Sequence, residues 1–283
     1  MIGLGTMGAG IAQVFAESGM TVVAVETSPE TLARGLESIN ALLSGAIARG
    51  RQTEAGKEAV LGRIQGVIDV AALHGVDAVL EALPEDIAIK RAVLSEVAQV
   101  VGPQTPILTN TSVLSVARIA SLIPNPARVA GLHFFNPAPV VRTVEIVSSI
   151  DTDPALVERL VDLVESLDKV AVQVKDRPGF LINALLFPYL NDVIQELDDG
   201  LATAEDIDVA LKLGLGYRTG PLEMLDLIGL DTHLQATEAI YQATGDARYA
   251  PPPLLRQMVT SGRLGDKTGS GFRTAGELST EGS

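Results

Sequence analysis

The chain contains no cysteine among its 283 residues. It can therefore form no disulfide and use no thiolate, which excludes small disulfide-stabilised secreted proteins and fits a reducing cytoplasm. Long apolar runs are also absent, since none approaches the roughly 20 residues of a membrane-spanning helix, and no basic segment precedes an apolar one at the N-terminus. We expect a soluble cytoplasmic protein with no membrane partner and no targeting segment.

Positive charge is scarce as well. The 21 lysines and arginines are outnumbered by 35 aspartates and glutamates, which gives a formal net charge of −14. Such a surface repels a polyanion, and no run of basic residues offsets it, so we expect no nucleic-acid partner. A ligand that carries phosphate has to be held by helix N-termini and a few placed cations.

The chain does contain enough apolar sequence for a large core, because hydrophobic residues make up 47% and charged residues 20%. Its length favours two domains. From Gly3 to about Val174, short β-branched runs alternate with longer helical stretches, the pattern of parallel strands joined by crossover helices. Ser28-Pro29 and Asp153-Pro154 have the layout of helix starts. The expected strands are Thr21–Val25, Ala78–Glu81, Ile107–Thr109, Val129–Leu132 and Val170–Val174.

A glycine-rich turn opens this pattern, with the sequence Gly3-Leu4-Gly5-Thr6-Met7-Gly8. Its G-x-G-x-x-G spacing suits a dinucleotide: the first glycine permits a tight turn, the second lets backbone approach a pyrophosphate, and the third lets helix and strand pack closely. In a chain with 27 glycines the spacing alone can arise by chance. A second feature is needed to support it.

Glu26 supplies that feature. It follows the strand Thr21–Val25 and lies 23 residues after Gly3, close to the separation of about 20 residues expected for the acid that binds the adenosine ribose. A carboxylate there repels a ribose 2′-phosphate, and Thr27-Ser28-Pro29 offers no arginine to receive one. The sequence therefore predicts NAD rather than NADP, the alternative being a solvated acid at the start of a loop.

The strand pattern stops at Asp176-Arg177-Pro178-Gly179, after which only helical patterns follow, including one from Pro221 to Ala243. We predict an α/β fold in which a Rossmann-type, doubly wound, mostly parallel sheet over residues 1–177 precedes a smaller all-helical domain over residues 178–283. A helical module with this much apolar sequence often buries its remaining apolar surface against a second copy of itself. We therefore expect a homodimer formed through this domain. Residues 277–283 read as a polar tail.

Of the three histidines, His133 stands where chemistry is expected. It lies in Gly131-Leu132-His133-Phe134-Phe135-Asn136-Pro137, directly after an apolar strand, and open α/β sheets carry their sites beyond the carboxyl ends of strands. A neutral imidazole can take an alcohol proton near pH 7. Glu145 follows twelve residues later in an apolar run, and orienting a histidine is one reason for an acid there. A hydrogen-bonded core histidine is the alternative.

His74 and His233 have no supporting motif, and we expect structural or exposed positions for both.

Six segments resemble the L-3-hydroxyacyl-CoA dehydrogenase family, particularly its bacterial 3-hydroxybutyryl-CoA type. They occur in the family's order across nearly the whole chain, which is far more specific than any single motif. They are Gly3 to Ala12, Glu81 to Asp86, Asn110-Thr111-Ser112, Gly131 to Pro137, Asp176 to Asn183 and Gly262 to Gly269.

The resemblance implies a role for each matching position. His133 matches the family's catalytic base and Glu145 the acid paired with it, while Ser112 and Asn183 match the polar residues that contact the substrate's C3 oxygen. A basic residue for the coenzyme A phosphate corresponds to Arg49. Four positions match contacts to the nicotinamide half of NAD, namely Glu85, Lys90, Asn136 and Lys267.

Several of these residues have structural alternatives. Ser112 and Asn110 could cap the helix that passes through Ala117 and Leu122. Glu81 could be a strand-end acid, and Lys267 a surface charge in a glycine-rich loop. Asn183 lies among apolar residues on a helix, where a buried polar group needs a partner.

The resemblance implies an NAD-dependent enzyme that reversibly oxidises an L-3-hydroxyacyl-CoA to the 3-ketoacyl-CoA, with an acyl-CoA as its partner molecule. Two other classes stay open: a dehydrogenase of free hydroxy acids or sugar acids, and a non-catalytic NAD-binding protein. Phe134-Phe135 follows the acyl-CoA form of the family.

The glycine turn has one feature that departs from the family. Family members place a strand of several apolar residues before the first glycine, and here only Met1-Ile2 precede it. A strand in the middle of a sheet has neighbours on both sides, so shortening it leaves backbone groups unpaired. We expect the natural protein to begin a few residues earlier.

Overall fold

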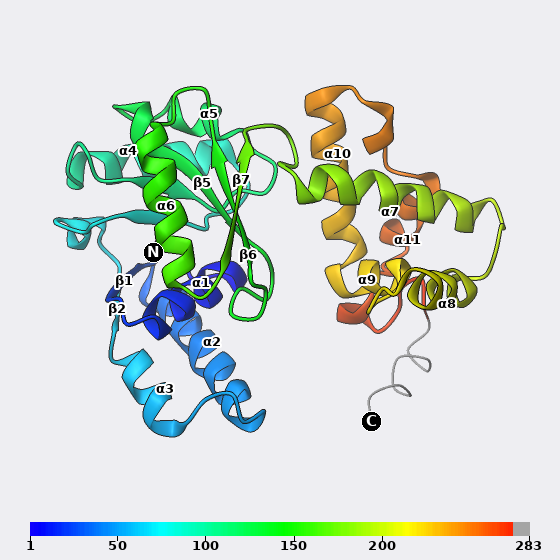
Figure 1. The fold of residues 1–283 in the computed structure, drawn as a ribbon, viewed down its shortest axis with the longest axis horizontal. Helices are drawn as coiled ribbons and strands as arrows, with labels where there is room; N and C mark the ends of the chain where they lie inside the picture. Colours follow the sequence, from blue (N-terminus) through cyan, green and yellow to red (C-terminus); the bar gives the residue numbers. More distant parts are fainter. Residues whose placement is uncertain (274–283) are drawn as a thin grey trace. The chain divides into compact units, whose positions relative to one another are not determined.

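The computed structural model describes residues 1–273, which form two compact units, Met1–Phe180 and a second unit from Leu181 onward (Figure 1). No helix within residues 1–273 has the length and apolar character needed to cross a membrane. Each unit has its own apolar core and is described separately.

A twisted sheet forms the centre of the first unit. Five strands lie in the order β3-β4-β5-β6-β7, and all neighbours are parallel except the antiparallel pair β5–β6. Two further parallel strands, β1 and β2, form the other side of the sheet. The strands are β1 Val22–Val25, β2 Ile64–Val67, β3 Val79–Glu81, β4 Ile107–Thr109, β5 Val129–Phe134, β6 Thr143–Ser148 and β7 Val170–Lys175.

Residues 1–3 connect the two sides of this sheet. Ile2 bridges in parallel to both Val25 of β1 and Glu81 of β3. Its N–H donates to the Leu80 carbonyl at 2.9 Å, and its own carbonyl accepts from Ala82 at 2.9 Å. The short N-terminal segment is therefore the innermost strand, with β1 on one side and β3 on the other.

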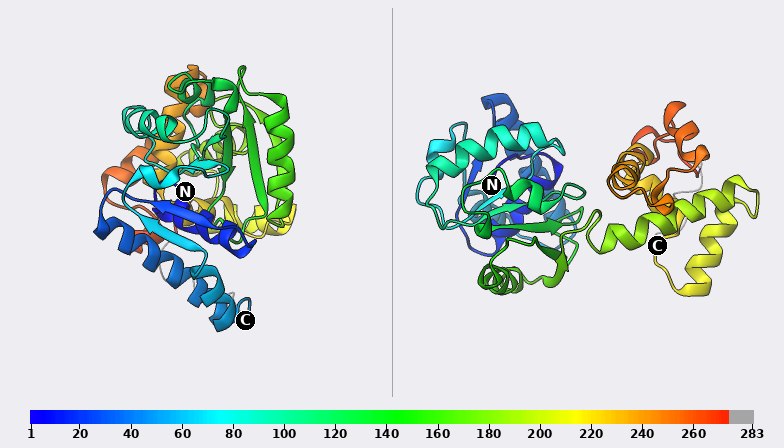
Figure 2. Two further views of the ribbon diagram at one scale, coloured as in Figure 1. Left: turned by 90° about the vertical axis from the view of Figure 1, so that its left-hand side faces the viewer. Right: turned by 90° about the horizontal axis from the view of Figure 1, so that it is seen from above.

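Helices cover both faces of the sheet, and Figure 2 shows α4 and α6 on opposite sides of it. One face packs against α4 and α5 through side chains such as Leu94 and Ile119. The other packs against α1 and α6 through Ile11 and Leu160. The helices of this unit are α1 Thr6–Glu17, α2 Pro29–Ala48, α3 Glu54–Leu61, α4 Ile87–Val100, α5 Val116–Ala120 and α6 Pro154–Ser166.

The doubly wound fold predicted from the sequence is confirmed, and so are the two proposed helix starts. The Ser28 hydroxyl accepts from Thr31 N at 3.2 Å to cap α2, and Asp153 accepts from Ala155 N at 2.9 Å to cap α6. The strand β2 was not predicted, because Ile64-Gln65-Gly66-Val67 contains a polar residue and a glycine and pairs only at the edge of the sheet.

The second unit consists of helices around a separate core that includes Leu190, Ile194 and Leu225. The helical pattern expected from Pro221 to Ala243 is present, but it is formed by two helices, α9 and α10. Gly229, which has a φ of 94°, separates them, and a backbone of this kind ends a helix. The helices are α7 Ile182–Asp198, α8 Ala204–Leu215, α9 Pro221–Ile228, α10 Leu230–Thr244 and α11 Pro253–Thr260, and the predicted tail at 277–283 lies outside the described residues.

Candidate active site

The glycine turn leads directly from the innermost strand into α1. Gly3 has a φ of 82°, and a Cβ on Gly8 would lie 1.9 Å from the Gly3 carbonyl oxygen, so neither position accepts a side chain. A Cβ on Gly5, in contrast, would meet no atom within 4 Å. Gly5 is also the N-cap of α1 and has no side chain to occupy the free N–H groups of the first turn. The turn therefore fits a pyrophosphate bound at the N-terminus of a helix.

Glu26 lies beside this turn, immediately after β1. Its Oε1 accepts from Leu4 N at 2.5 Å, and its Oε2 accepts from Thr27 N at 3.2 Å. The carboxylate is thus fixed against the backbone of the glycine turn, on the side where β1 ends. Leu4 is itself buried and anchors the turn in the cluster between α1 and α2.

His133 and Glu145 face each other across the antiparallel pair β5–β6. The register places them directly opposite, so both side chains lie on the same face of the sheet. His133 Nδ1 and Glu145 Oε2 are 2.8 Å apart, and both side chains are buried. When the carboxylate accepts the Nδ1 proton, Nε2 carries a free lone pair and can accept a proton from another group.

Ser112 lies at that other nitrogen. Its hydroxyl is 3.2 Å from His133 Nε2, so the three residues form a continuous line from hydroxyl to imidazole to carboxylate. The imidazole is flanked by two aromatic rings, Phe135 at 4.5 Å and Phe180 at 5.4 Å between centroids. These rings limit the access of water and hold the imidazole in one orientation.

The loop that carries Ser112 is fixed by Glu85. The Glu85 Oε1 accepts from Ser112 N at 2.7 Å and from Val113 N at 3.0 Å, and the Thr111 hydroxyl also donates to it. Asn110 anchors the start of the loop, because its Oδ1 accepts from Phe134 N at 2.8 Å. The loop is thereby attached both to β5, which carries His133, and to the segment that follows β3.

A buried ion pair between Lys90 and Glu81 lies next to Glu85. Lys90 Nζ lies 2.7 Å from Glu81 Oε1 and 3.5 Å from Glu85 Oε2. Lys90 and Glu81 are 1% and 0% exposed. The Thr109 hydroxyl and Leu83 N also donate to the Glu81 carboxylate, which gives this buried charge the hydrogen bonds it requires. Lys90 therefore lies within the protein interior, with Glu85 between it and the surface.

Helix capping, the alternative role for Ser112 and Asn110, was wrong. The N-cap of α5 is Ser115, whose hydroxyl accepts from Arg118 N at 3.3 Å. Asp176, at the end of β7, also accepts from Val116 N at 3.0 Å and Ala117 N at 2.8 Å. Ser115 and Asp176 thus accept the hydrogen bonds of the N–H groups at the start of α5. The Ser112 hydroxyl contacts His133 instead.

The remaining predicted residues lie elsewhere. Asn136 is exposed after β5, and Arg49 is exposed at the C-cap of α2. Asn183 and Lys267 belong to the second unit: Asn183 lies in the first turn of α7, and Lys267 is exposed and pairs with Asp231. Of the two histidines without a motif, His74 is exposed, and His233 is buried in the second unit.

The residues that hold the site without having been predicted to do so include Glu81, Thr111 and Asp176. The role of Glu81 could have been predicted, because an acid at the end of an apolar strand with a lysine nine residues later can form a buried ion pair. The role of Asp176 depends on β7 and α5 lying side by side, which no local pattern reveals.

The turn and the histidine pair share one edge of the sheet, since Gly3, Glu81, Thr109 and His133 all lie at the carboxyl ends of parallel strands. Ligands of open α/β sheets bind at this edge. A glycine turn suited to a dinucleotide and a buried imidazole suited to accept an alcohol proton, at the same edge of the sheet, are the features of a nicotinamide-dependent dehydrogenase. Two family models then match almost the whole chain: 3-hydroxyacyl-CoA dehydrogenase, NAD binding domain, at residues 1–177, and the C-terminal domain of the same enzymes at residues 179–275. The chain belongs to the 3-hydroxyacyl-CoA dehydrogenase family, and its cofactor is NAD.

Individual relatives agree with this assignment. The chain is 43% identical to 3-hydroxyadipyl-CoA dehydrogenase of Escherichia coli over 96% of its own length but only 57% of that protein. A probable 3-hydroxybutyryl-CoA dehydrogenase of Deinococcus radiodurans is 39% identical over 96% of this chain and 98% of the relative. The crystal structure of FadB2 from M. tuberculosis superposes with a TM-score of 0.94 at 38% identity, covering 96% of each chain.

Proposed function

We propose that the protein catalyses the reversible oxidation of an L-3-hydroxyacyl-CoA to the 3-ketoacyl-CoA, with His133 as the proton acceptor. The observation that carries this proposal is the line of Ser112, His133 and Glu145, joined by contacts of 3.2 and 2.8 Å. Its position at the carboxyl edge of the sheet, on the same edge as the glycine turn, supports the reaction type. The names of the relatives support the substrate class.

In this mechanism, His133 Nε2 removes the proton from the C3 hydroxyl of the substrate. Glu145 stabilises the imidazolium that results, because a carboxylate in hydrogen-bond contact favours the charged ring. Ser112 orients the C3 oxygen, and the aromatic rings of Phe135 and Phe180 keep competing water away. NAD, when bound, supplies the acceptor for the hydride that leaves C3. The glycine turn would hold its pyrophosphate and Glu26 its adenosine ribose.

Four further positions keep proposed roles. Glu85 would face the nicotinamide side while it holds Ser112 in place. Lys90 would hold the Glu85 carboxylate in position from the protein interior through their ion pair. Asn136 and Lys267 would contact the same half of NAD, and Asn183 would contact the substrate oxygen. Arg49 would bind the coenzyme A phosphate from the end of α2.

Turnover of acetoacetyl-CoA compared with free acetoacetate tests the substrate class. With NADH at pH 7, the proposal predicts steady-state reduction of acetoacetyl-CoA and at least a hundredfold lower kcat/KM for acetoacetate, since roughly 2.7 kcal/mol of coenzyme A binding is lost. An equal kcat/KM for the two compounds favours the free hydroxy acid class. Binding of NADH without turnover of either compound favours a non-catalytic protein.

We also propose a homodimer formed through the second unit in the cytoplasm. Exposed apolar side chains occur on three of its helices: Leu185 on α7, Leu213 on α8 and Leu227 on α9 are 69%, 82% and 61% exposed. A helical unit with so much exposed apolar surface gains stability by pairing. Light scattering at micromolar concentration is expected to give twice the monomer mass of 29.6 kDa, and a monomer would contradict the proposal.

A further inference from the structure

Lys169, in the turn between α6 and β7, is a buried lysine that does not belong to the candidate active site. It is 7% exposed, and its Nζ donates to the carbonyls of Ala138 at 2.7 Å and Val141 at 2.8 Å. Loss of hydration lowers the pKa of this amino group, and the Glu17 and Asp168 carboxylates oppose that shift. A buried cation is stable only where hydrogen bonds replace its hydration, so the two carbonyl groups are held firmly at Nζ.

Both carbonyls belong to the segment 135–141, which directly follows β5 and which we call the β5 loop. The loop begins at Phe135, whose ring lies 4.5 Å from the His133 imidazole between centroids. Within the loop, the Pro137 carbonyl accepts from Val141 N at 3.0 Å. The β5 loop is thus a compact turn that the buried amino group holds at two points, and its first residue packs on the imidazole.

The β5 loop packs directly on α1, the helix that begins at the glycine turn. A Cβ on Gly10 would lie 3.3 Å from both Ala138 Cβ and Pro139 Cδ, so helix and loop are in close contact with no side chain of Gly10 between them. Phe15 of α1 also packs edge-on against Phe134 of β5, at 6.2 Å between centroids. The loop therefore connects the helix that fits the pyrophosphate to the strand that carries the imidazole.

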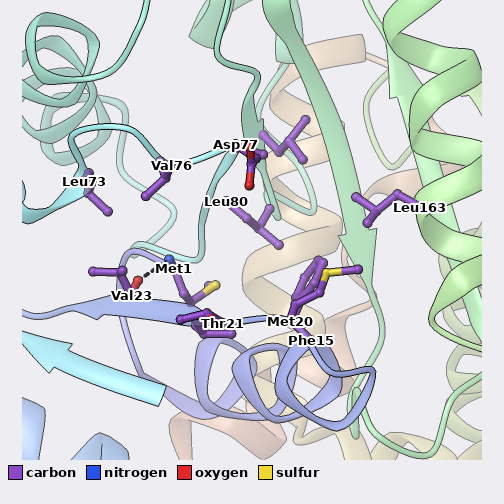
Figure 3. A pocket seen from close by; sticks show the side chains of 13 residues that line it. Met1, Phe15, Met20, Thr21, Val23, Leu73, Val76, Asp77, Leu80 and Leu163 are labelled. Carbon is purple, nitrogen blue, oxygen red and sulfur yellow. Dashed lines mark hydrogen bonds between the residues drawn. The ribbon is translucent and has the colours of Figure 1, made fainter. Parts of the chain in front are cut away.

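The turn that carries Lys169 is anchored in the same apolar cluster as the loop. Leu167, two residues earlier, and Ala138 are both buried in the cluster between the sheet and the helices α1 and α6. Figure 3 shows two further side chains packed against this cluster, Phe15 of α1 and Leu163 of α6, where they line one apolar cavity. A packed backbone thus presents the amino group to the β5 loop.

Lys169 lies at the edge of the sheet where ligands bind. Thr143, the first residue of β6, pairs with Val170, the first residue of β7. Val144 pairs with Phe134, the last residue of β5. The start of β7 is therefore level with the carboxyl end of β5, and Lys169 holds the loop at the edge that carries the candidate site.

A second buried cation with carbonyl partners lies at the opposite edge of the sheet. Arg128 is 5% exposed and immediately precedes β5, and burial lowers the pKa of its guanidinium as well. It donates to the carbonyls of Gly102, Thr105 and Pro124 at 2.5, 3.2 and 3.2 Å. The two cations share their burial and their kind of partner but differ in position. Arg128 is therefore a matched control for Lys169.

We propose that Lys169 is a positioning residue for the dehydrogenase reaction and acts through the β5 loop. Its two hydrogen bonds keep Phe135 against the imidazole and Asn136 directed toward the cofactor. A displacement of about 1 Å near the reacting atoms can lower a rate about a hundredfold, so the loop has to be held closely. The effect on turnover rests on the proposed function, whereas the effect on NADH binding rests on the cofactor of the family and the contact proposed for Asn136.

Lys169→Met tests this inference, because methionine fills the space of the lysine stem without an amino group. With NADH at pH 7, the variant is expected to lower kcat for acetoacetyl-CoA reduction about tenfold and to raise the Kd for NADH, measured by fluorescence, about tenfold. Lys169→Arg keeps a cation with several donors and should restore most of both values. Arg128→Met should lower Tm, as Lys169→Met does, but leave kcat and the NADH Kd near wild type.

A Lys169→Met protein with a lower Tm but wild-type kcat and Kd would overturn the proposal, since Lys169 would then have a structural role only. Equal kinetic losses in Arg128→Met would also overturn it, because they would reflect a general loosening of the sheet. Where Lys169→Met does not fold, Lys169→Gln and Arg128→Gln give the same comparison with the same expected difference. If the wild-type protein binds NADH but does not reduce acetoacetyl-CoA, the proposed function fails, and the NADH Kd values alone decide the role of Lys169.

Discussion

The two units each bury one histidine, and the difference lies in what the two rings contact. His133 in the first unit has a carboxylate at Nδ1 and a hydroxyl at Nε2. His233 in the second unit has the neutral side-chain oxygen of Asn191 at 3.0 Å from Nε2, and its Nδ1 has no hydrogen-bond partner within the described residues. Phe187 packs edge-on against it at 5.0 Å.

Burial alone therefore does not make a histidine suitable for proton transfer. For His233, loss of hydration lowers the pKa to about 4, so this ring stays neutral near pH 7 and serves as a packed polar group. The carboxylate next to His133 offers compensation for a positive charge on the ring. A base that becomes an imidazolium during the reaction needs such a partner.

Removal of the His133 imidazole should produce the largest effect. His133→Asn is expected to lower kcat for acetoacetyl-CoA reduction by about 10²–10⁴, because general acid–base catalysis contributes that range. The NADH dissociation constant, measured by fluorescence, should stay within about threefold of wild type because the glycine turn is untouched. A kcat near wild type would remove His133 from the mechanism.

The stability of the second unit should depend on pH through His233. Between pH 6.5 and 4 the unfolded chain binds a proton at this residue that the folded chain excludes. Stability is thus fully present above pH 6.5 and falls by about 3 kcal/mol as the pH drops to 4. Urea unfolding at several pH values should show this slope, and His233→Gln should flatten it. An unchanged slope in the variant would contradict the interpretation.

Glu145→Gln keeps the size of the side chain and removes its charge. A hydrogen bond to a charged group contributes about 1.5–3 kcal/mol, so kcat should fall about 10- to 150-fold. His133→Asn combined with Glu145→Gln should be little worse than His133→Asn alone, because Glu145 acts through the imidazole. Additive losses in the double variant would show that the carboxylate acts independently.

Ser112→Ala should have the smallest effect of the series. It removes one hydrogen bond between neutral groups, about 0.5–1.5 kcal/mol, which corresponds to a two- to tenfold loss in kcat/KM. Ser115→Ala, three residues along the same loop, is the matched control, since it weakens the cap of α5 and should lower Tm with little change in kcat/KM. The reverse pattern would place the functional hydroxyl at Ser115.

The parts of this picture that the sequence could predict depend on local patterns. The glycine spacing and Glu26 lie within one strand–turn–helix unit, and their relation follows from their separation. His133 and Glu145 were predicted as a pair, and the antiparallel register of β5 and β6 gives the reason they meet. Ser28 and Asp153 were identified because capping residues act within one turn.

The parts that escaped prediction depend on burial, on backbone angle or on contacts between different helices and strands. The Lys90–Glu81 pair links α4 to β3 inside the core, and Asp176 caps a helix about sixty residues earlier in the chain. Gly229 ends α9 although the apolar spacing continues on both sides of it. The ion pair, the cap and the end of α9 therefore follow from burial and backbone angle, which residue type alone does not reveal.

Chemical rescue of His133→Ala with free imidazole tests the role of this residue most directly. The substitution leaves space between Phe135 and Phe180, next to the Glu145 carboxylate. Imidazole is expected to restore part of the lost rate of acetoacetyl-CoA reduction in a saturable way, while His233→Ala should need no rescue and show none. A His133→Ala rate that does not respond to imidazole, while the protein stays folded and binds NADH, would contradict the assignment of His133 as the proton acceptor.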